Sequence, residues 1–345
     1  MKEKYGDVFL VHLGVVPVVV VSGLETVKKV LLKQGEQFAD RPKLYTLSLL
    51  NDGTSLSFTE NYGEPWKLHK KIAKMCLREF SKSARSASSP SLFEQYVSEE
   101  ANLLVETLLQ HSSKKGYYNP IDHITYAVAN VVCALCFGKR YDHDDDDEFL
   151  GVIQISEEAQ NSAASAAPAD FIPILRYFPL PGLKALLKAV DRFNNFSKKQ
   201  IKEHYDSFDK NHIRDITDAL LLDCSKRKLK DKHSVLTDAQ VLSTVIDVFG
   251  AGFDTTSSAL QWSLFYLLKF PELQEKIHKE IGTKIGFSRM PRFEDRKKCI
   301  SWKHLFMRFS GIPRFHHLPF HTGPLSSVTV WVVFARELDP GNPNV

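Results

Sequence analysis

The stretch Val241-Leu-Ser-Thr-Val-Ile-Asp-Val-Phe-Gly-Ala-Gly-Phe-Asp-Thr-Thr-Ser-Ser-Ala259 decides the fold of this chain. Thr237 and Gln240 precede it three residues apart, the spacing of a capping box that closes the first turn of a helix. The apolar run continues to Phe270, and Pro271 marks a break and the start of another helix. The pattern predicts a helix of about 33 residues and about 50 Å. A helix this long and this apolar is expected to be buried most of the way round.

The middle of this helix breaks the usual propensity rules. Gly250, Gly252 and two threonines fall within two turns, where each glycine costs on the order of 1 kcal/mol relative to alanine. The glycines would let a flat molecule approach the backbone, and the Thr255 hydroxyl is placed to bond the carbonyl of Ala251. A carboxylate at Asp254 is costly in an apolar helix unless it is paired or functional. Local rules tend to fail at functional sites, so the pattern indicates a binding surface. The alternative is a core helix bent by small residues.

The segment Ala251-Gly-Phe-Asp-Thr-Thr256 resembles the oxygen-activation motif on the long central helix of cytochrome P-450 monooxygenases. Asp247-Val-Phe-Gly-Ala-Gly-Phe-Asp254 and Phe38-Ala-Asp-Arg-Pro42 are similar to the vertebrate family 1 type, the microsomal enzymes that oxidise planar aromatic compounds. The resemblance covers residues 1 to about 298 and implies a mainly α fold with a small β region. Further segments that carry it are 130–138, 170–179, 215–220 and 290–296.

The resemblance implies roles for residues on the central helix. Thr255 would hydrogen-bond the oxygen substrate, and Asp254 would help to relay protons. Ala251 and Gly252 would make room beside the haem, and the same Ala251 would border the substrate. The other candidates to line the substrate pocket on this helix are Asp247, Phe249 and Gly250.

A second helix is expected from about residue 61 to Phe80, with Trp66 and Lys70 on one face. They match a Trp-x-x-x-Arg pattern that holds a haem propionate, with a lysine that cannot make the bidentate contact of arginine. Phe171 is a candidate to stack on a planar substrate, although it fits an ordinary core position equally well. For the helix expected from about residue 61 to Phe80, the resemblance implies docking of an acidic reductase. The alternative is a solvated helix face. Its basic residues are Lys67, His69, Lys71, Lys74 and Arg78.

The rest of the pattern predicts a helical chain with one hairpin. Two strands are expected between Val8 and Val21, around a turn at Gly14, followed by a helix from Leu24 to Lys33. Helical periodicity recurs over 92–110, 121–137, 181–208 and 267–281, and loops are expected at 81–91, 142–148 and 226–233.

Composition limits the partners. A net charge of +4 over 345 residues argues against a nucleic-acid partner, and 43% hydrophobic residues can bury a large core. The five cysteines lack disulfide or zinc spacing, and Cys133 and Cys136 lie in an apolar helical run typical of buried thiols. No apolar run reaches the roughly 18 residues of a membrane span. The resemblance implies haem b, NADPH-cytochrome P-450 reductase, a small apolar aromatic substrate and the cytosolic face of the endoplasmic reticulum membrane, with the family's anchor upstream of residue 1.

The chain departs from the family after about Cys299. The family's Glu-x-x-Arg motif and its Phe-x-x-Gly-x-x-x-Cys-x-Gly loop, whose thiolate is the iron ligand, are both absent. Codons that encode residues 302–321 can also be read in the frame that starts at the third base of each codon. In that frame they can encode Glu-Ala-Phe-Ile-His-Glu-Val-Phe-Arg, which resembles the missing helix. We therefore hypothesise a one-base frameshift near the codons for residues 298–301, which a clean genomic read would contradict.

This hypothesis divides the chain into a partial cytochrome P-450 domain over 1–298 and a loosely structured tail over 299–345. In such a tail the closely spaced His316, His317 and His321 form no metal site. Without the thiolate we expect this chain to be inactive. The alternative function is a non-catalytic helical protein that at most binds hydrophobic ligands or haem weakly.

Overall fold

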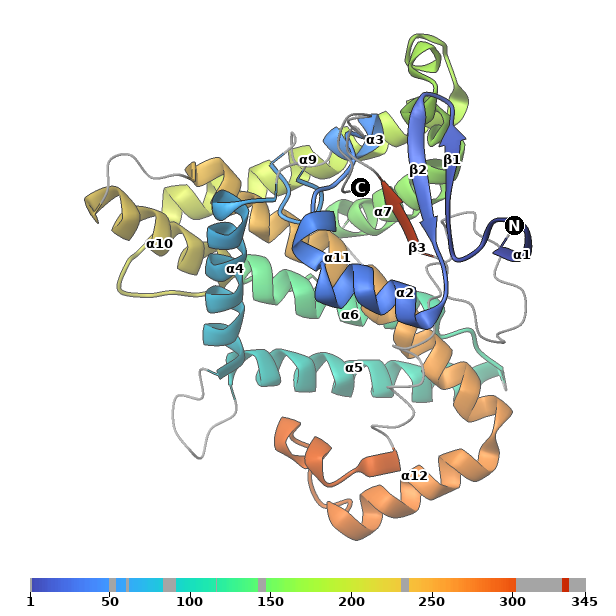
Figure 1. Cartoon of the computed structure of the whole chain (residues 1–345). Coiled ribbons are helices and arrows are strands. Elements are labelled where there is room, and N and C mark those ends of the chain that lie inside the picture. The colour runs from blue at the N-terminus through green and yellow to red at the C-terminus, as the bar shows by residue number, and fades with distance from the viewer. Residues whose placement is uncertain are drawn as a thin grey trace.

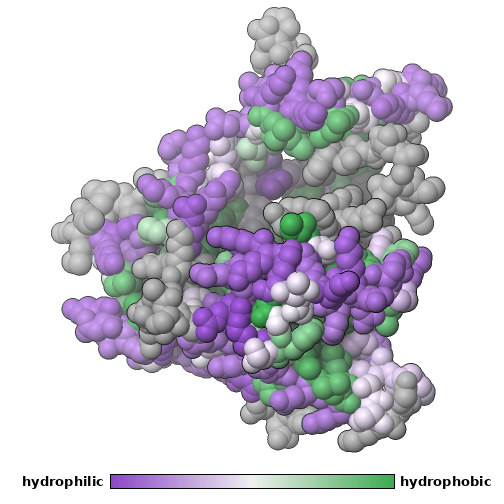
Figure 2. Space-filling view, turned by 90° about the horizontal axis from the view of Figure 1, so that it is seen from below, coloured by the Kyte–Doolittle hydropathy of each residue, from purple (hydrophilic) through white to green (hydrophobic). Residues whose placement is uncertain are grey.

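A computed structural model describes residues 2–49, 54–59, 62–82, 91–115, 117–141, 147–230, 236–301 and 331–334 of the chain. The described part is mainly helical with one small sheet, as the sequence predicts (Figure 1). Seen from below, its surface is largely hydrophilic, and hydrophobic side chains gather there in small groups (Figure 2).

The long helix predicted from the sequence is α11 (Asp238–Lys269). The predicted capping box is present, because the amide of Gln240 donates to Thr237 Oγ1 at 3.2 Å and the amide of Thr237 donates to Gln240 Oε1 at 2.9 Å. The helix ends before Phe270, and α12 (Pro271–Lys284) begins with the proline that the sequence marks as a break.

The expectation that α11 is buried most of the way round is wrong for its second half. Residues 241–246 are all buried. Further along, Phe265 is 52% exposed and Leu268 is 79% exposed. One helix therefore passes from the protein interior to its surface, and the segment Ala251–Thr256 lies where this change begins.

The other long helices pack around α11. It lies on α6 (Ile121–Phe137), and α5 (Leu92–Lys115) runs beside α6 (Figure 1). A second pair, α7 (Asp147–Ala166) and α9 (Pro181–Ser207), packs together and reaches the same core. The sequence pattern predicts the bounds of α6 and locates α9, but it does not identify α7.

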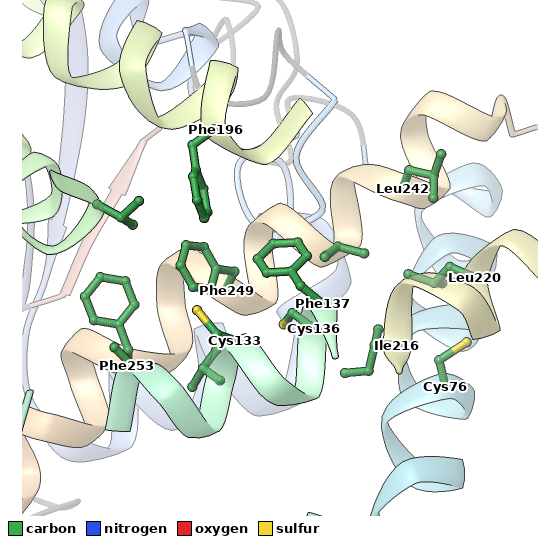
Figure 3. Close-up of a cluster of buried hydrophobic side chains, with 14 of the residues drawn as sticks. Cys76, Cys133, Cys136, Phe137, Phe196, Ile216, Leu220, Leu242, Phe249 and Phe253 are labelled. Atoms are coloured by element: carbon green, nitrogen blue, oxygen red, sulfur yellow. The ribbon is translucent and has the colours of Figure 1, made fainter. Parts of the chain in front are cut away.

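Phe249 stands at the centre of the main hydrophobic core (Figure 3). Its ring centroid lies 5.2 Å from that of Phe137, 5.6 Å from Phe253, and 5.8 Å from both Phe193 and Phe196. Offset and edge-to-face ring pairs at these distances add to the stabilisation from area burial. The cluster thus joins α6, α9 and α11.

All five cysteines are buried thiols, which confirms the prediction made for Cys133 and Cys136. Burial raises the pKa of both Cys133 and Cys136, which keeps them protonated and unreactive.

The sheet contains the predicted hairpin, β1 (Val8–Leu13) and β2 (Val16–Val21), paired antiparallel from Val8 opposite Val21 to Leu13 opposite Val16. Gly14 turns the chain with a φ of +57°, and a Cβ there would lie 2.0 Å from the carbonyl oxygen of Phe171. Both the conformation and the close approach require glycine.

A third strand, β3 (Trp331–Phe334), pairs antiparallel with β2, with Val18 opposite Phe334. An ordered strand differs from the loose structure expected for the tail. The rest of the tail after Ser301, including the three histidines, lies outside the described residues, so the division near residue 298 stays a prediction.

The remaining elements refine the sequence-based expectations. The helix expected from Leu24 to Lys33 continues as a π-helical turn in its second half, and the basic connector expected at 226–233 is helical up to Lys230. Most of the loops expected at 81–91 and 142–148 lies outside the described residues. The other bounds are α1 (Lys2–Tyr5), α2 (Leu24–Lys28), η1 (Lys29–Lys33), η2 (Gly35–Phe38), α3 (Tyr45–Ser48), α4 (Glu64–Lys82), α8 (Pro168–Phe171), η4 (Pro173–Tyr177), α10 (Ile216–Lys230) and η5 (Phe293–Lys297).

Candidate functional site

The middle of α11 presents a short open face. Ala251, Thr255 and Ser258 are exposed, and Asp254 is half-buried beside them. The hydroxyl of Thr255 donates to the carbonyl of Ala251 at 2.8 Å, which is the bond that the sequence predicts. Such a back-bond competes with the helical ladder and suits a helix that bends at a site. The face therefore combines a small side chain, a hydroxyl and a carboxylate within two turns.

The two glycines of the motif have a different role from the one expected. A Cβ on Gly252 would lie 3.2 Å from Cγ1 of Val132 on α6, and one on Gly250 would lie 3.2 Å from Cζ of Phe193 on α9. Both glycines thus let neighbouring helices approach α11 closely. The expectation that they admit a flat molecule is corrected, because their Cα atoms face protein.

Two of the expected substrate contacts also lie elsewhere. Phe249 is 0% exposed and is enclosed by the phenylalanines of the core, so its ring has a packing role. Phe171 is half-buried at the end of α8, and its carbonyl accepts from the amide of Val15 at 3.0 Å. The structure places it beside the hairpin turn.

A third expected substrate contact, Asp247, is directed to a loop. Its Oδ1 accepts from the hydroxyl of Ser55 at 2.7 Å, and its Oδ2 accepts from the amide of Leu56 at 2.6 Å. The carboxylate is therefore engaged by protein donors at the edge of the site.

Trp66 and Lys70 share one face of α4, as predicted. The Lys70 Nζ lies 4.5 Å from the centroid of the Trp66 ring, and Trp66 Nε1 donates to the carbonyl of Leu56 at 2.9 Å. They border a pocket of about 220 Å³ that contains two cationic side chains, Arg41 and Lys70, and no carboxylate among its lining residues. Such a pocket suits an anionic group. The lining comprises Ala39, Arg41, Leu56, Ser57, Thr59, Tyr62, Trp66 and Lys70.

Arg41 is the functional candidate that sequence reasoning missed. It lies within the segment Phe38-Ala-Asp-Arg-Pro42, which indicates the family but gives no direction for the guanidinium. Only the fold brings it to the pocket with Trp66 and Lys70.

One residue of the basic surface expected on α4, His69, is buried instead of exposed. His69 is 4% exposed, and its Nε2 lies 2.7 Å from Thr244 Oγ1 on α11. Burial, with a smaller effect from the charge of Arg227, lowers the pKa of His69 to about 4, so the ring is neutral. The exposed cations are Lys67, Lys70, Lys71, Lys74 and Arg78.

A separate cluster of His204, Asp215 and Asp218 brings three ligand-type atoms within 4.8 Å of one another. These groups already satisfy one another and their neighbours. His204 Nε2 lies 2.8 Å from Asp215 Oδ2, and Arg214 binds both oxygens of Asp218 at 2.6 and 2.9 Å. The cluster is thus a buried ion-pair network that joins α9 to α10.

A haem fits part of this arrangement. The open face at Ala251 and Thr255 suits one side of a flat ring, and the cationic pocket suits its propionates. The chain offers no exposed thiolate to the iron, because all five cysteines are buried thiols. The described residues thus fit the ring and the propionates of a haem but not its thiolate ligand.

Comparisons with known proteins bear on this arrangement. The sequence matches the family model for cytochrome P450 over residues 1–299. It is 45% identical over 298 residues to cytochrome P450 1A1 of Oncorhynchus mykiss, covering 86% of this chain and 57% of the relative. It is 43% identical over 323 residues to cytochrome P450 1A1 of Homo sapiens, covering 93% of this chain and 62% of the relative. The chain thus spans only part of the length of these curated relatives.

Proposed function

This chain belongs to the cytochrome P450 family, and we propose that its parent activity is a haem-dependent monooxygenation of apolar, planar aromatic substrates by O₂. The observation that carries the proposal is the open face of α11, where the motif places a hydroxyl and a carboxylate beside a small residue. Haem, when bound, would supply the activation of O₂.

The residues of this chain have distinct tasks in that proposal. The Thr255 hydroxyl would turn from the Ala251 carbonyl to donate a hydrogen bond toward the oxygen substrate. The Asp254 carboxylate, half-buried next to it, would pass protons inward from water. Ala251 would leave space for a planar ligand, because its methyl group is the smallest side chain on the exposed face.

The cationic pocket would hold the acidic edge of the cofactor. Arg41 can make bidentate contacts to a carboxylate, whereas Lys70 acts as a point charge above the Trp66 ring. We expect the substitution Arg41→Ala to weaken haem binding more than the loss of any other single pocket residue.

The partners follow from two surfaces. The cations along α4 fit the acidic face of NADPH-cytochrome P-450 reductase, and Lys71 and Lys74 are exposed there. Exposed apolar side chains at the hairpin turn and η4 support contact with the endoplasmic reticulum membrane, because Val15 is 68%, Ile174 63% and Tyr177 88% exposed. Among the described helices none has the length and apolarity needed to cross a bilayer.

For the chain as it stands we propose no catalysis, because no thiolate reaches the open face of α11. The second candidate function is non-catalytic binding of haem or apolar ligands. Thermal melting with added haemin tests binding, since a ligand that binds only the folded protein raises its melting midpoint.

The comparison needs three proteins. The wild type should gain stability with haemin, Arg41→Ala combined with Lys70→Ala should gain less, and the control Lys74→Ala, one turn further along α4, should match the wild type. A wild-type midpoint that haemin leaves unchanged would refute haem binding. After reduction and addition of CO, the absence of a thiolate-type absorbance band is expected, and its presence would refute the proposed inactivity.

A further inference from the structure

The Asp247 carboxylate accepts hydrogen bonds from several donors of the loop formed by residues 54–59. The Ser55 hydroxyl donates to Oδ1 at 2.7 Å, and the Leu56 amide donates to Oδ2 at 2.6 Å. The Ser57 amide reaches the same Oδ2 at 3.4 Å. Hydrogen bonds to an ionised acceptor are roughly twice as strong as neutral ones. A single carboxylate on α11 therefore holds the start of this turn.

The loop is fixed from α11 at a second point. The Ser243 hydroxyl, one helical turn before Asp247, shares its hydrogen between the Thr54 carbonyl at 2.8 Å and the Gln240 carbonyl at 2.7 Å. The Ser55 oxygen in turn accepts from the amide of Phe58 at 3.2 Å. Ser55 is 2% exposed, so the loss of its acceptor would leave the buried O–H donor of Ser55 unsatisfied, although its oxygen still accepts from Phe58.

The Leu56 residue passes this restraint on to the pocket. Its amide donates to Asp247, and its carbonyl accepts from Trp66 Nε1 at 2.9 Å. Leu56 also lines the cationic pocket together with Trp66 and Lys70. One loop residue thus connects the carboxylate on α11 to the indole on α4.

We infer that Asp247 is a positioning residue, which sets residues 54–59 and, through Leu56, the orientation of Trp66 at the pocket wall. This role replaces the direct substrate contact that the sequence suggests. The inference rests on the proposed function only for the identity of the pocket's ligand, because the hydrogen bonds stand without a ligand.

Asp170 provides an internal comparison. Its two oxygens accept from the amide and the hydroxyl of Thr46, both at 2.8 Å, so it holds α3 from α8. The two carboxylates use the same chemistry on different segments. Their substitutions should therefore have separate effects.

Amide hydrogen exchange on the full-length chain tests the inference. Asp247→Asn should reduce protection of the Leu56 and Ser57 amides by about tenfold, or about 1.4 kcal/mol, because one amide oxygen cannot replace the carboxylate. Asp170→Asn should affect Thr46 and leave the Leu56 amide unchanged. Asp254→Asn, on the same helix, should leave both segments unchanged.

The Trp66 indole gives a readout that a general loss of stability would not move. Its N–H resonance should shift in Asp247→Asn and remain in place in Asp170→Asn. If Asp247→Asn does not fold, Ser55→Ala, which removes one donor and keeps the charge, should produce the same pattern with a smaller change. Unchanged Leu56 exchange, or an unmoved indole resonance, would overturn the positioning role.

A haemin titration separates this inference from the proposed function. If the wild type binds haemin, Asp247→Asn should weaken the affinity about tenfold through the displaced Trp66. If the wild type binds none, the proposed ligand is wrong, and the exchange and resonance data alone decide the role of Asp247.

Discussion

Lowering the pH should destabilise this protein through one buried side chain, His69. The ring is 4% exposed, lies between α4 and α11, and has its Nε2 2.7 Å from Thr244 Oγ1. A protonated imidazole there would be a buried charge, and the charge of Arg227 adds repulsion. The folded protein therefore resists protonation of His69, whereas the unfolded chain accepts the proton readily.

The size of the effect follows from two pKa values. The pKa of His69 is about 4 in the folded protein, and an unperturbed histidine titrates near 6.5. Because the folded-state pKa is the lower one, the stabilisation is complete above about pH 6.5 and is lost as the pH falls toward 4. Linkage gives a loss of about 2 kcal/mol at pH 5 and about 3 kcal/mol at pH 4, relative to pH 7.

Urea unfolding of the wild type and of His69→Gln at several pH values measures this loss. Carboxylates titrate in the same range, but they do so equally in both proteins, so the difference between the two isolates His69. We expect the free energy of unfolding of the wild type, relative to that of His69→Gln, to fall by about 3 kcal/mol between pH 7 and pH 4. A difference that stays constant over that range would refute the assignment of a neutral, buried ring.

Three further predictions test other parts of the fold. Burial alone lowers the pKa of His204, but the hydrogen bond and the charge of Asp215 outweigh it, so the net pKa is raised. His204→Gln should therefore lose the most stability below about pH 6.5, and this loss should vanish as the pH rises through the folded-state pKa. Urea unfolding at several pH values measures the loss. Gly252→Ala should destabilise by about 1 kcal/mol, because strain against Val132 exceeds the gain in helix propensity, and in a Val132→Ala background a double-mutant cycle should show it to be stabilising. Glu280 accepts from the amides of residues 300 and 301 and has its pKa lowered to about 2, first by Lys284, so Glu280→Gln should speed the exchange of both amides.

Local patterns predicted the elements that depend on local chemistry. The β-branched run around Gly14 and the capping box at Thr237 each specify structure within a few residues, and both are confirmed. The back-bond from Thr255 to Ala251 is likewise a contact within one helical turn.

The residues whose roles the sequence did not predict depend on partners that are distant in the chain. Ser55 and Asp247 are separated by 192 positions, so the sequence reveals a costly carboxylate but not the donors that satisfy it. The role of Gly252 was not predicted for the same reason. The sequence shows a small residue there but not whether a ligand or Val132 lies opposite it. His69 sits among lysines in the sequence, and only the packing of α4 on α11 shows that its ring faces inward.

The passage of α11 from the interior to the surface also has a consequence for evolvability. Substitutions over residues 241–246 are constrained by packing on all sides, so nearly every change there has a folding penalty. Ala251, Thr255 and Ser258 share one exposed face, where substitutions usually change stability by no more than about 0.5 kcal/mol. Folding stability therefore limits change over residues 241–246, whereas at these three positions the limits on change come from function rather than from packing.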